Sequence, residues 1–287
     1  MYSDEVYNTL RRCAEKTLFL QRELLPLTSN FLREINWTTE QRHVVECLLT
    51  ASARSSESAI LLISYAQLWD SEILVRAIVE STIKTTYLLQ SKSDFETRYQ
   101  EYRHDLFQIG LLKDHSKTQE LLNLISDNDA PSWRPLKDRL LSEAEINDIS
   151  GKYPQSRRRS LETQWGFTGI LGSFSRSNDE AFKILAGLSY SYSMSSHILH
   201  ADHIGTSLPF EFDQRSPERR NAILMAYGSR LLSDILTCLK IRLFSGYRFS
   251  GLDLSPLEEV NNAIENLLSE FGNLYDDWLG MEYRSKT

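Results

Sequence analysis

The sequence predicts an all-α fold, an elaborated helical bundle of long antiparallel helices. Capping residues and apolar residues at three- and four-residue steps recur along nearly all of its 287 residues. Glycine (12) and proline (7) are scarce, which disfavours a β-sandwich or barrel with its many turns. The chain also lacks both the strand–helix alternation and the glycine-rich phosphate loop of the nucleotide-binding α/β folds.

Caps and helix breakers place the first helices. Ser3 is the expected cap of the first helix, which Pro26 interrupts. Thr38 and Gln41 resemble a capping box at the start of a long second helix. Ser93-Asp94 begins the fourth helix, whose aromatic and aliphatic residues follow helical steps. The expected helices run over about residues 3–25, 38–69, 70–90 and onward from 93.

The second half of the chain contains an irregular stretch between long helices. We expect a helix over 178–203, a loop over 206–213, and further helices after Pro217 and Pro256. The sequence therefore predicts a single domain over residues 1–287. Its parts are a core of about 38–125 and 178–245, a polar insertion of about 127–156 and a C-terminal helix of about 256–279.

Composition and charge exclude several classes of protein. A net charge of −7 disfavours a protein that coats nucleic acid. Three scattered cysteines are too few for a disulfide framework or a zinc knuckle. The first residues lack the basic and apolar segments of a secretory signal, and no apolar run approaches the ~18 residues of a membrane span. We therefore expect a cytoplasmic protein without membrane partners.

The helix over 70–90 carries an unusual charged pair. Arg76 and Glu80 fall on one stripe of a helix that is apolar on its other faces, so the helix is expected to be central in the bundle. A buried charge is costly unless it is paired. Two interpretations stay open: a pair that ties helices together, or an arginine presented into a cleft and oriented by its own glutamate.

The helix over 178–203 carries a polar stripe without long charged side chains. The stripe consists of Ser189, Tyr192, Ser193, Ser196, His200 and His203. Such a surface is expected to face protein or a cleft, since solvent-facing stripes normally carry charges. The alternative is a closely packed helix whose serines bond their own backbone.

Metal sites and known nucleophile motifs are poorly supported. His197, His200 and His203 step by three residues and drift around the helix, so they do not converge on one ion. Glu40 and His43 have the spacing of half a di-iron site, but no second half exists. We expect no metal and no cofactor.

Three patterns in the sequence together resemble those of a known family. They are Arg76-x-x-x-Glu80, the helix that carries Phe95, Arg98, Tyr99 and Tyr102, and the later Tyr192-x-x-x-Ser196-x-x-x-His200. That family is a broad one of bacterial all-helical proteins associated with phage defence and similar to the HEPN superfamily (higher eukaryotes and prokaryotes nucleotide-binding). The resemblance covers roughly residues 55–245. It implies a HEPN-like core, a homodimer, and an RNA-cleaving or nucleotide-binding effector or toxin that needs no metal.

For a ribonuclease, the chemistry assigns roles to individual residues, which here lie on two helices and not on one as in the superfamily's motif. His200 would move a proton to or from an RNA 2′-hydroxyl or leaving oxygen, and Arg76 would stabilise the phosphate charge. Glu80 would hold Arg76, while Tyr192, Ser196 and His203 would orient the imidazole or bind phosphate. The expected product is a 2′,3′-cyclic phosphate. Arg98 and His104 match the R-x4–6-H motif of the superfamily and form a second-choice catalytic pair.

A second class of function stays open beside the first. In it the chain is a non-catalytic interaction or regulatory module, and its polar pairs are buried networks that fix helix register. A regulatory protein partner is expected under either hypothesis.

Overall fold

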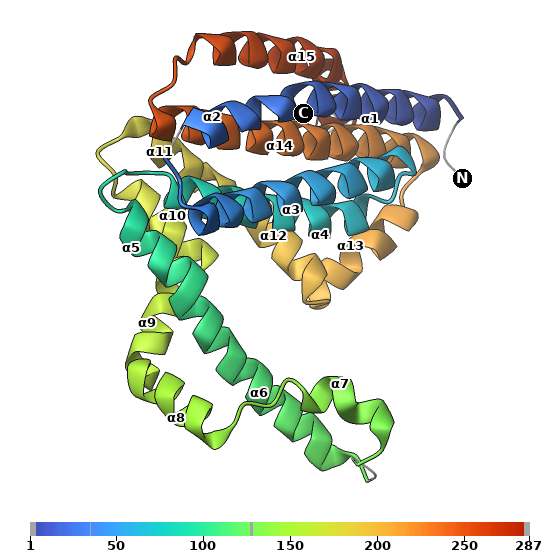
Figure 1. Ribbon diagram of the computed structural model, residues 1–287. Coiled ribbons are helices and arrows are strands. Elements are labelled where there is room, and N and C mark those ends of the chain that lie inside the picture. The colour runs from blue at the N-terminus through green and yellow to red at the C-terminus, as the bar shows by residue number, and fades with distance from the viewer. Residues whose placement is uncertain (1–3, 35, 127–128, 284–287) are drawn as a thin grey trace. The chain divides into compact units, whose positions relative to one another are not determined.

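The computed structural model describes residues 4–34, 36–126 and 129–283, and these residues form helices and no strand (Figure 1). The all-α prediction is confirmed. The chain divides into two compact units, one of residues 1–91 and 174–287 and the other of residues 92–173. The second unit contains the whole of the expected 127–156 insertion.

The first unit holds the long helices. They are α1 (Asp4–Leu24), the 3₁₀ turn η1 (Leu25–Leu27), α2 (Thr28–Glu34), α3 (Thr39–Ser64), α4 (Leu68–Leu88), α11 (Glu180–Lys183), the 3₁₀ turn η4 (Ile184–Leu188), α12 (Ser189–Leu199), α13 (His203–Asp213), α14 (Pro217–Ser250) and α15 (Ser255–Tyr283). Helix α4 packs against α3, α12 and α14, and α14 also packs against α1 and α15. Helix α4 is therefore central in this unit, as its apolar circumference predicts.

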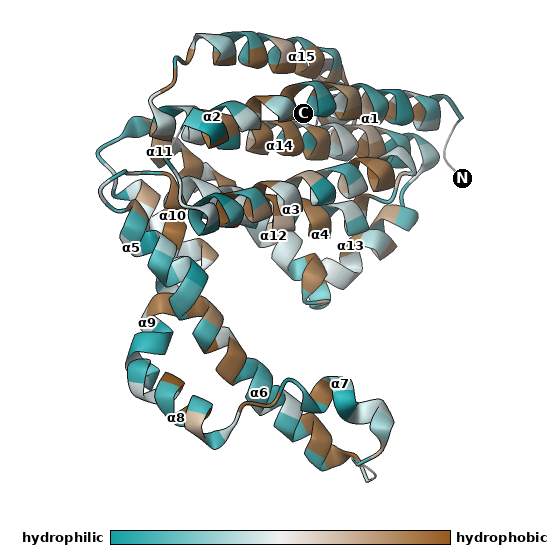
Figure 2. Cartoon of the chain, viewed as in Figure 1, coloured by the Kyte–Doolittle hydropathy of each residue, from teal (hydrophilic) through white to brown (hydrophobic). Residues whose placement is uncertain are grey.

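The core of the first unit forms around α14. Its buried face includes Leu224, Leu231, Ile235 and Leu243, all with at most 1% of their surface exposed. Figure 2 shows α14 as predominantly hydrophobic along much of its visible length. By length and composition α14 is apolar enough to cross a membrane, but 67% of its most apolar window is buried inside the protein. The buried core helix of a globular protein can have the same length and hydropathy, and the burial of α14 favours its being such a core helix.

The capping box at the start of α3 is confirmed. Thr38 accepts a hydrogen bond from the Gln41 backbone, and the Gln41 side chain accepts one from the Thr38 backbone.

The break between α3 and α4 comes earlier than expected. It lies at residues 65–67, where Ala66 has φ 58° and the backbone N–H of Gln67 closes back on the Leu62 carbonyl. An alanine in the left-handed region leaves no signal in the sequence, which explains the misplaced boundary.

The expected helix over 178–203 and loop over 206–213 are wrong in detail. Helix α12 ends at Leu199, and residues 203–213 form α13. The turn between them places Ala201 at φ 49°, and the Asp202 side chain caps α13 by accepting from Gly205 N at 3.0 Å. This strong N-cap starts a helix where the sequence suggested a loop.

The second unit consists of shorter helices and one long one. They are α5 (Phe95–Gln100), the π-helical turn η2 (Glu101–Asp105), α6 (Leu106–Leu124), the 3₁₀ turn η3 (Pro131–Trp133), α7 (Arg134–Lys137), α8 (Glu143–Lys152), α9 (Gln155–Trp165) and most of α10 (Phe167–Ser175). The buried Glu101 carboxylate accepts hydrogen bonds from Gln164 and the Trp165 indole at 2.7 and 2.9 Å. These bonds tie η2 to α9 inside this unit.

Candidate functional site

Three charged side chains form a polar stripe on α4. Glu72, Arg76 and Glu80 are spaced four residues apart, so they lie on one face of the helix. Each one reaches a polar partner on α12 or α14. Because Glu80 bonds Tyr192 and Glu72 bonds Ser195, α12 runs antiparallel to α4.

Arg76, Glu80 and Tyr192 form a closed triad. Arg76 Nε donates to Glu80 Oε1 at 3.3 Å, and Arg76 Nη2 donates to the Tyr192 hydroxyl at 2.7 Å. The Tyr192 hydroxyl in turn donates to Glu80 Oε1 at 2.8 Å. The guanidinium carbon also lies 4.3 Å from the centroid of the Tyr192 ring, a cation–π distance. Three contacts therefore fix the arginine side chain.

The triad is partly open and incompletely satisfied. The side chains of Arg76 and Glu80 are 12% and 33% exposed, so solvent reaches the carboxylate edge. Burial and the hydrogen bond to Glu80 raise the pKa of Tyr192, so the phenol stays protonated and donates. The second terminal nitrogen of Arg76, Nη1, is buried and finds no acceptor among the described residues. A buried donor without a partner costs about 1–3 kcal/mol, so an acceptor at this nitrogen is favoured.

A second, more deeply buried cluster lies around Glu72. This carboxylate is fully buried, accepts from Ser195 Oγ at 2.7 Å and forms an ion pair with Arg230 Nη2. Arg230 Nη1 donates to Asp234 at 3.0 Å, and the Arg230 guanidinium carbon lies 4.4 Å from the centroid of the Tyr227 ring. Arg230 of α14 therefore links Glu72 of α4 to Asp234, which lies one turn further along α14.

The surroundings of the cluster shift the pKa of Asp234 and Tyr227, among others. Burial raises the pKa of Asp234 to about 6, although the positive charge of Arg230 opposes this. Burial, and next the negative charge of Glu72, raise the pKa of Tyr227. The Tyr227 hydroxyl lies close to Glu72, but within the described part of the chain it makes no hydrogen bond of normal geometry. In both groups burial disfavours the charged form, and Asp234 still pairs with Arg230.

Sequence reasoning missed the Glu72 cluster. Glu72 lies near the start of the expected helix over 70–90, where an acidic residue is ordinary, although it is four residues before Arg76 on the same face. The i,i+4 pair of Arg230 and Asp234 on α14 was a second available signal. Ser195 lies beside the predicted polar stripe of α12 and not on it, and its side chain is buried.

The predicted histidines are not brought to Arg76. His200 follows Tyr192 by eight residues, which places it about 12 Å further along the helix axis. His200 and His203 are both exposed, and no side-chain hydrogen bond joins the half-buried Ser196 to His200 among the described residues. The side chain of Ser189 lies outside the described part of the chain. The structure thus separates the expected site into a triad on α4 and α12 and a group of exposed histidines.

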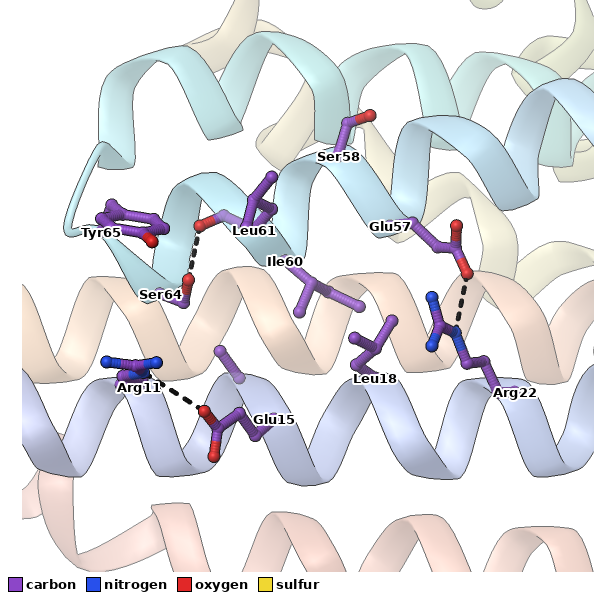
Figure 3. A pocket seen from close by; sticks show the side chains of 11 residues that line it. Arg11, Glu15, Leu18, Arg22, Glu57, Ser58, Ile60, Leu61, Ser64 and Tyr65 are labelled. Atoms are coloured by element: carbon purple, nitrogen blue, oxygen red, sulfur yellow. Dashed lines mark hydrogen bonds and ion pairs between the residues drawn. The ribbon is translucent and has the colours of Figure 1, made fainter.

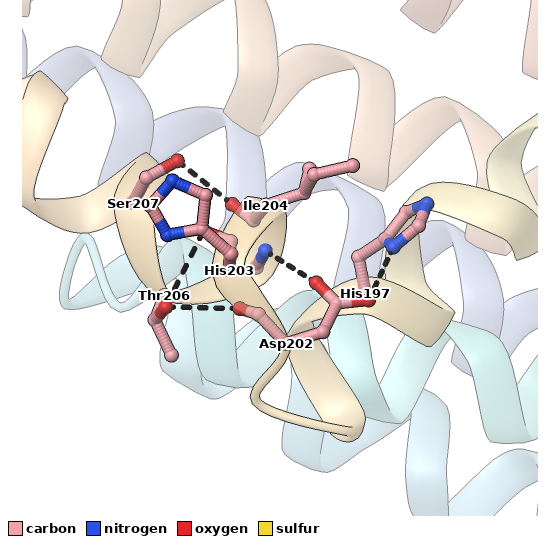
Figure 4. Close-up of polar contacts among 7 residues, drawn as sticks. His197, Asp202, His203, Ile204, Thr206 and Ser207 are labelled. Atoms are coloured by element: carbon pink, nitrogen blue, oxygen red, sulfur yellow. Dashed lines mark hydrogen bonds and ion pairs between the residues drawn. The ribbon is translucent and has the colours of Figure 1, made fainter.

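The histidines surround the α12–α13 turn, which Figure 4 shows from close by. His197 Nδ1 lies 2.6 Å from Asp202 Oδ2, and the two side chains face each other across the turn. The backbone N–H of Gly205, and next His197, lower the pKa of Asp202. In the residues that the structure describes, no group of three His, Cys, Asp or Glu side chains has the arrangement of a metal site.

The second-choice pair lies in the second unit. Arg98 Nη2 bonds Asp94 at 3.3 Å, and the His104 ring packs edge-on against Tyr99 with centroids 5.7 Å apart. His104 belongs to the π-helical turn η2. Both residues are described, and no hydrogen bond or ion pair joins one side chain to the other.

Two hollows of the first unit could hold a ligand. A groove of about 400 Å³ lies between α1 and α3, where Arg11 pairs with Glu15 and Arg22 pairs with Glu57 (Figure 3). Its four charged residues thus already neutralise one another. The other hollow, of about 370 Å³, lies beside the Glu72 cluster, and six of its thirteen lining residues are aromatic. We call it the aromatic cavity.

Comparison with known proteins gives a family for most of the chain. Residues 42–215, more than half of the sequence, match the model of a family described as a family of unknown function (DUF5677). This range includes the triad on α4 and α12 and all the predicted site residues. No curated protein and no solved structure matches the chain.

Proposed function

The chain belongs to the DUF5677 family, whose description names no activity, and for this member we propose binding of RNA or a nucleotide through a phosphate group held at Arg76. The triad of Arg76, Glu80 and Tyr192 supports this proposal. An arginine that is already fixed in place loses little entropy when it binds a phosphate oxygen.

The observation that carries the proposal is Nη1 of Arg76, which is buried and has no hydrogen-bond partner among the described residues. Glu80 and Tyr192 occupy Nε and Nη2, which leaves Nη1 as the donor that a phosphate oxygen can accept from. A charge-assisted bond of this kind is about twice as strong as a neutral one. Glu80 both orients Arg76 and repels an incoming phosphate by its charge. Neutralising Glu80 should therefore strengthen binding.

Cleavage of RNA is a further step of the proposal. In it a base takes the proton of the RNA 2′-hydroxyl, the 2′-oxygen attacks phosphorus and the P–O5′ bond breaks. The leaving 5′-oxygen takes a proton from water, which gives a 2′,3′-cyclic phosphate and a 5′-hydroxyl end. Because His200 lies about 12 Å beyond Tyr192 along the helix, Glu80 is the nearer base to Arg76. Arg76 would stabilise the charge that grows on the phosphate oxygens.

Binding is tested with a short fluorescent RNA and with ATP, by anisotropy and calorimetry. We expect Arg76→Ala to weaken binding roughly tenfold or more and Glu80→Gln to tighten it, because a bond to a charged group contributes about 1.5–3 kcal/mol. Arg22→Ala is the matched control, since this arginine also pairs with a glutamate but lies on the surface. Equal affinity of wild type and Arg76→Ala, with both proteins folded, would refute the proposal.

Cleavage is tested separately by following RNA length and the chemistry of the new ends. Loss of cleavage in Glu80→Gln with activity kept in His200→Ala supports Glu80 as the base. The reverse result supports His200 in the role that the sequence suggested. Intact RNA with wild-type protein that still binds it would restrict the function to binding.

We propose a cellular role in phage defence, in the cytoplasm and as a homodimer, on the resemblance of the motifs to defence-associated helical proteins. Bacteria that express wild type or Arg76→Ala are challenged with phage, and survival and total RNA integrity are compared. Equal survival of the two strains at equal protein levels would argue against this role.

A non-catalytic interaction module is the second candidate function. The buried Glu72–Arg230–Asp234 cluster favours it, because such a network fixes the register of two helices without needing a ligand. If Arg76 also serves only to fix helix register, Arg76→Ala should lower the free energy of unfolding by several kcal/mol and leave RNA binding unchanged.

A further inference from the structure

The aromatic cavity is a second candidate site that shares no lining residue with the Arg76 triad. Residues of α4, α12, α13, α14, α15 and the α13–α14 connection line it: Trp69, Met194, Leu208, Glu211, Phe212, Arg215, Ile223, Ala226, Tyr227, Arg230, Tyr275, Trp278 and Tyr283. All of them belong to the first compact unit. Its volume of about 370 Å³ falls in the range of roughly 300–1,000 Å³ that is typical of small-molecule sites.

Two groups of aromatic rings form much of the lining. In the first, the Trp69 ring lies 6.1 Å from Phe212 and 5.2 Å from Tyr227, centroid to centroid. In the second, the Trp278 ring of α15 lies 5.4 Å from Tyr275 and 5.7 Å from Tyr283. Tyr275 and Tyr283 are 48% and 58% exposed, an unusual surplus of exposed aromatic area on one helix end. These rings offer flat faces to a flat ligand.

The charged residues of the cavity offer both kinds of hydrogen-bonding group. Glu211 supplies an acceptor, and the guanidiniums of Arg215 and Arg230 supply donors. The charge of Arg230 is already met by Glu72 and Asp234, so the cavity does not select a free anion. The two guanidiniums also disfavour an ammonium ligand, which aromatic walls alone would attract.

We propose that the aromatic cavity binds a planar heteroaromatic ring of about purine size that carries donors and acceptors on its edge. The ring stacks on the aromatic walls, and its polar edge pairs with Glu211 and the arginines. Stacking supplies most of the affinity, as it does when proteins bind unpaired bases. A free nucleoside and a nucleotide share this chemistry.

The test is calorimetric titration of the full chain with guanosine, adenosine, GMP and ribose. Wild type should bind both nucleosides and should not bind ribose. Trp278→Ala and Tyr275→Ala should each weaken nucleoside binding roughly tenfold. Glu211→Gln should weaken guanosine more than adenosine, because the guanine edge donates two hydrogens that a carboxylate accepts. Tighter binding of GMP than of guanosine identifies the nucleotide as the preferred source, and equal binding identifies the ring alone.

A matched control uses an exposed tyrosine of the other hollow, Tyr65→Ala, which should bind nucleosides like wild type. Folded wild-type protein that binds neither nucleoside would overturn the inference, as would equal affinity for ribose or full affinity in both Trp278→Ala and Tyr275→Ala. If nucleosides bind and this binding is lost in Trp278→Ala while wild type binds no RNA, the inference stands and the proposed phosphate site at Arg76 fails.

Discussion

Two glutamates on one face of α4 show how burial decides the energetic role of a residue. Glu72 is fully buried and has partners on α12 and α14, whereas the side chain of Glu80 is 33% exposed and bonds Arg76 and Tyr192. A fully buried carboxylate must stay paired, since its desolvation is not repaid otherwise. A partly exposed one can exchange partners with solvent or a ligand. Glu72 is thus the structural residue and Glu80 the functional candidate.

The first prediction concerns Glu72. Glu72→Ala removes the partner of Arg230 and of Ser195 in the core, so we expect the free energy of unfolding to fall by about 3–5 kcal/mol. Urea unfolding followed by circular dichroism measures it. The control is Glu57→Ala, which removes an exposed ion pair with Arg22 and should cost less than about 1 kcal/mol. Similar losses in the two variants would contradict the structural role of Glu72.

The second prediction concerns Asp234, whose pKa is raised from 3.8 to about 6 in the folded protein. Between about pH 4 and 6 the folded state binds more protons than the unfolded state, so this group's contribution to stability falls as the pH rises through that window. Relative to Asp234→Asn, wild type should therefore gain about 2.4 kcal/mol when the pH is lowered from 7 to 4. Urea unfolding of both proteins across this range measures the difference. A difference that is constant with pH, or of opposite sign, would contradict the raised pKa.

The sequence alone identified the residues of the Arg76 triad but not those of the Glu72 cluster. Arg76 and Glu80 stand out because charge is unexpected on an apolar helix, and Tyr192 stands out on a stripe without charges. Glu72 and Arg230 do not stand out, because each also fits a solvent-facing position near a helix end or on a long helix. Their pairing joins residues 158 positions apart. Only tertiary packing identifies such a pair.

At the scale of elements, the α12–α13 turn positions the histidines. Residues 200–202 connect two helices in three residues, with Ala201 in the left-handed region and Asp202 as the cap of α13. Gly205 then allows the first turn of α13 to approach α12 closely. A Cβ at position 205 would lie 2.1 Å from the His197 carbonyl oxygen, nearer than real Cβ contacts occur.

The third prediction follows from this close approach. Gly205→Ala should lower stability by about 1–3 kcal/mol, because the atoms it would meet are backbone atoms that cannot turn aside. Gly151→Ala in α8 is the matched control, since a Cβ there meets nothing within 4 Å. That variant should gain up to about 1 kcal/mol from helix propensity. Thermal unfolding compares the two, and a neutral Gly205→Ala would show that α13 can move away from α12.

Helix boundaries divide into those that local chemistry determines and those that packing determines. The Thr38 capping box and Pro217 in the first turn of α14 are local signals, and both appear where expected. The ends of α3 and α12 depend on Ala66 and Ala201, whose positive φ angles alanine does not favour. Tertiary contacts impose these conformations, so the sequence predicted longer helices than the structure contains.

At the scale of the whole molecule, the long helix α14 raises the question of whether the chain is a membrane protein. Its length and hydropathy would suit a membrane span, yet it also carries Arg230, Asp234 and Arg242. Arg230 pairs with Glu72 of α4, and Arg242 donates to Thr82 of the same helix at 2.5 Å. In a bilayer these side chains would leave their partners on α4, which would cost about 2.5–3.5 kcal/mol per charge at the membrane centre.

The fourth prediction is that the protein stays in water because α14 is the core of the first unit. In phase separation with Triton X-114, wild type should remain in the aqueous phase and unfold cooperatively. A triple variant with leucine at positions 72, 230 and 234 (Glu72→Leu, Arg230→Leu and Asp234→Leu) removes the charges of the Glu72 cluster from the contact between α4 and α14. If packing and not charge keeps α14 inside, this variant should also remain aqueous while it is folded, and should enter the detergent phase only after heating exposes α14. Partition of folded wild type into detergent would contradict the core assignment, because two-thirds of the apolar window of α14 is covered by the other helices.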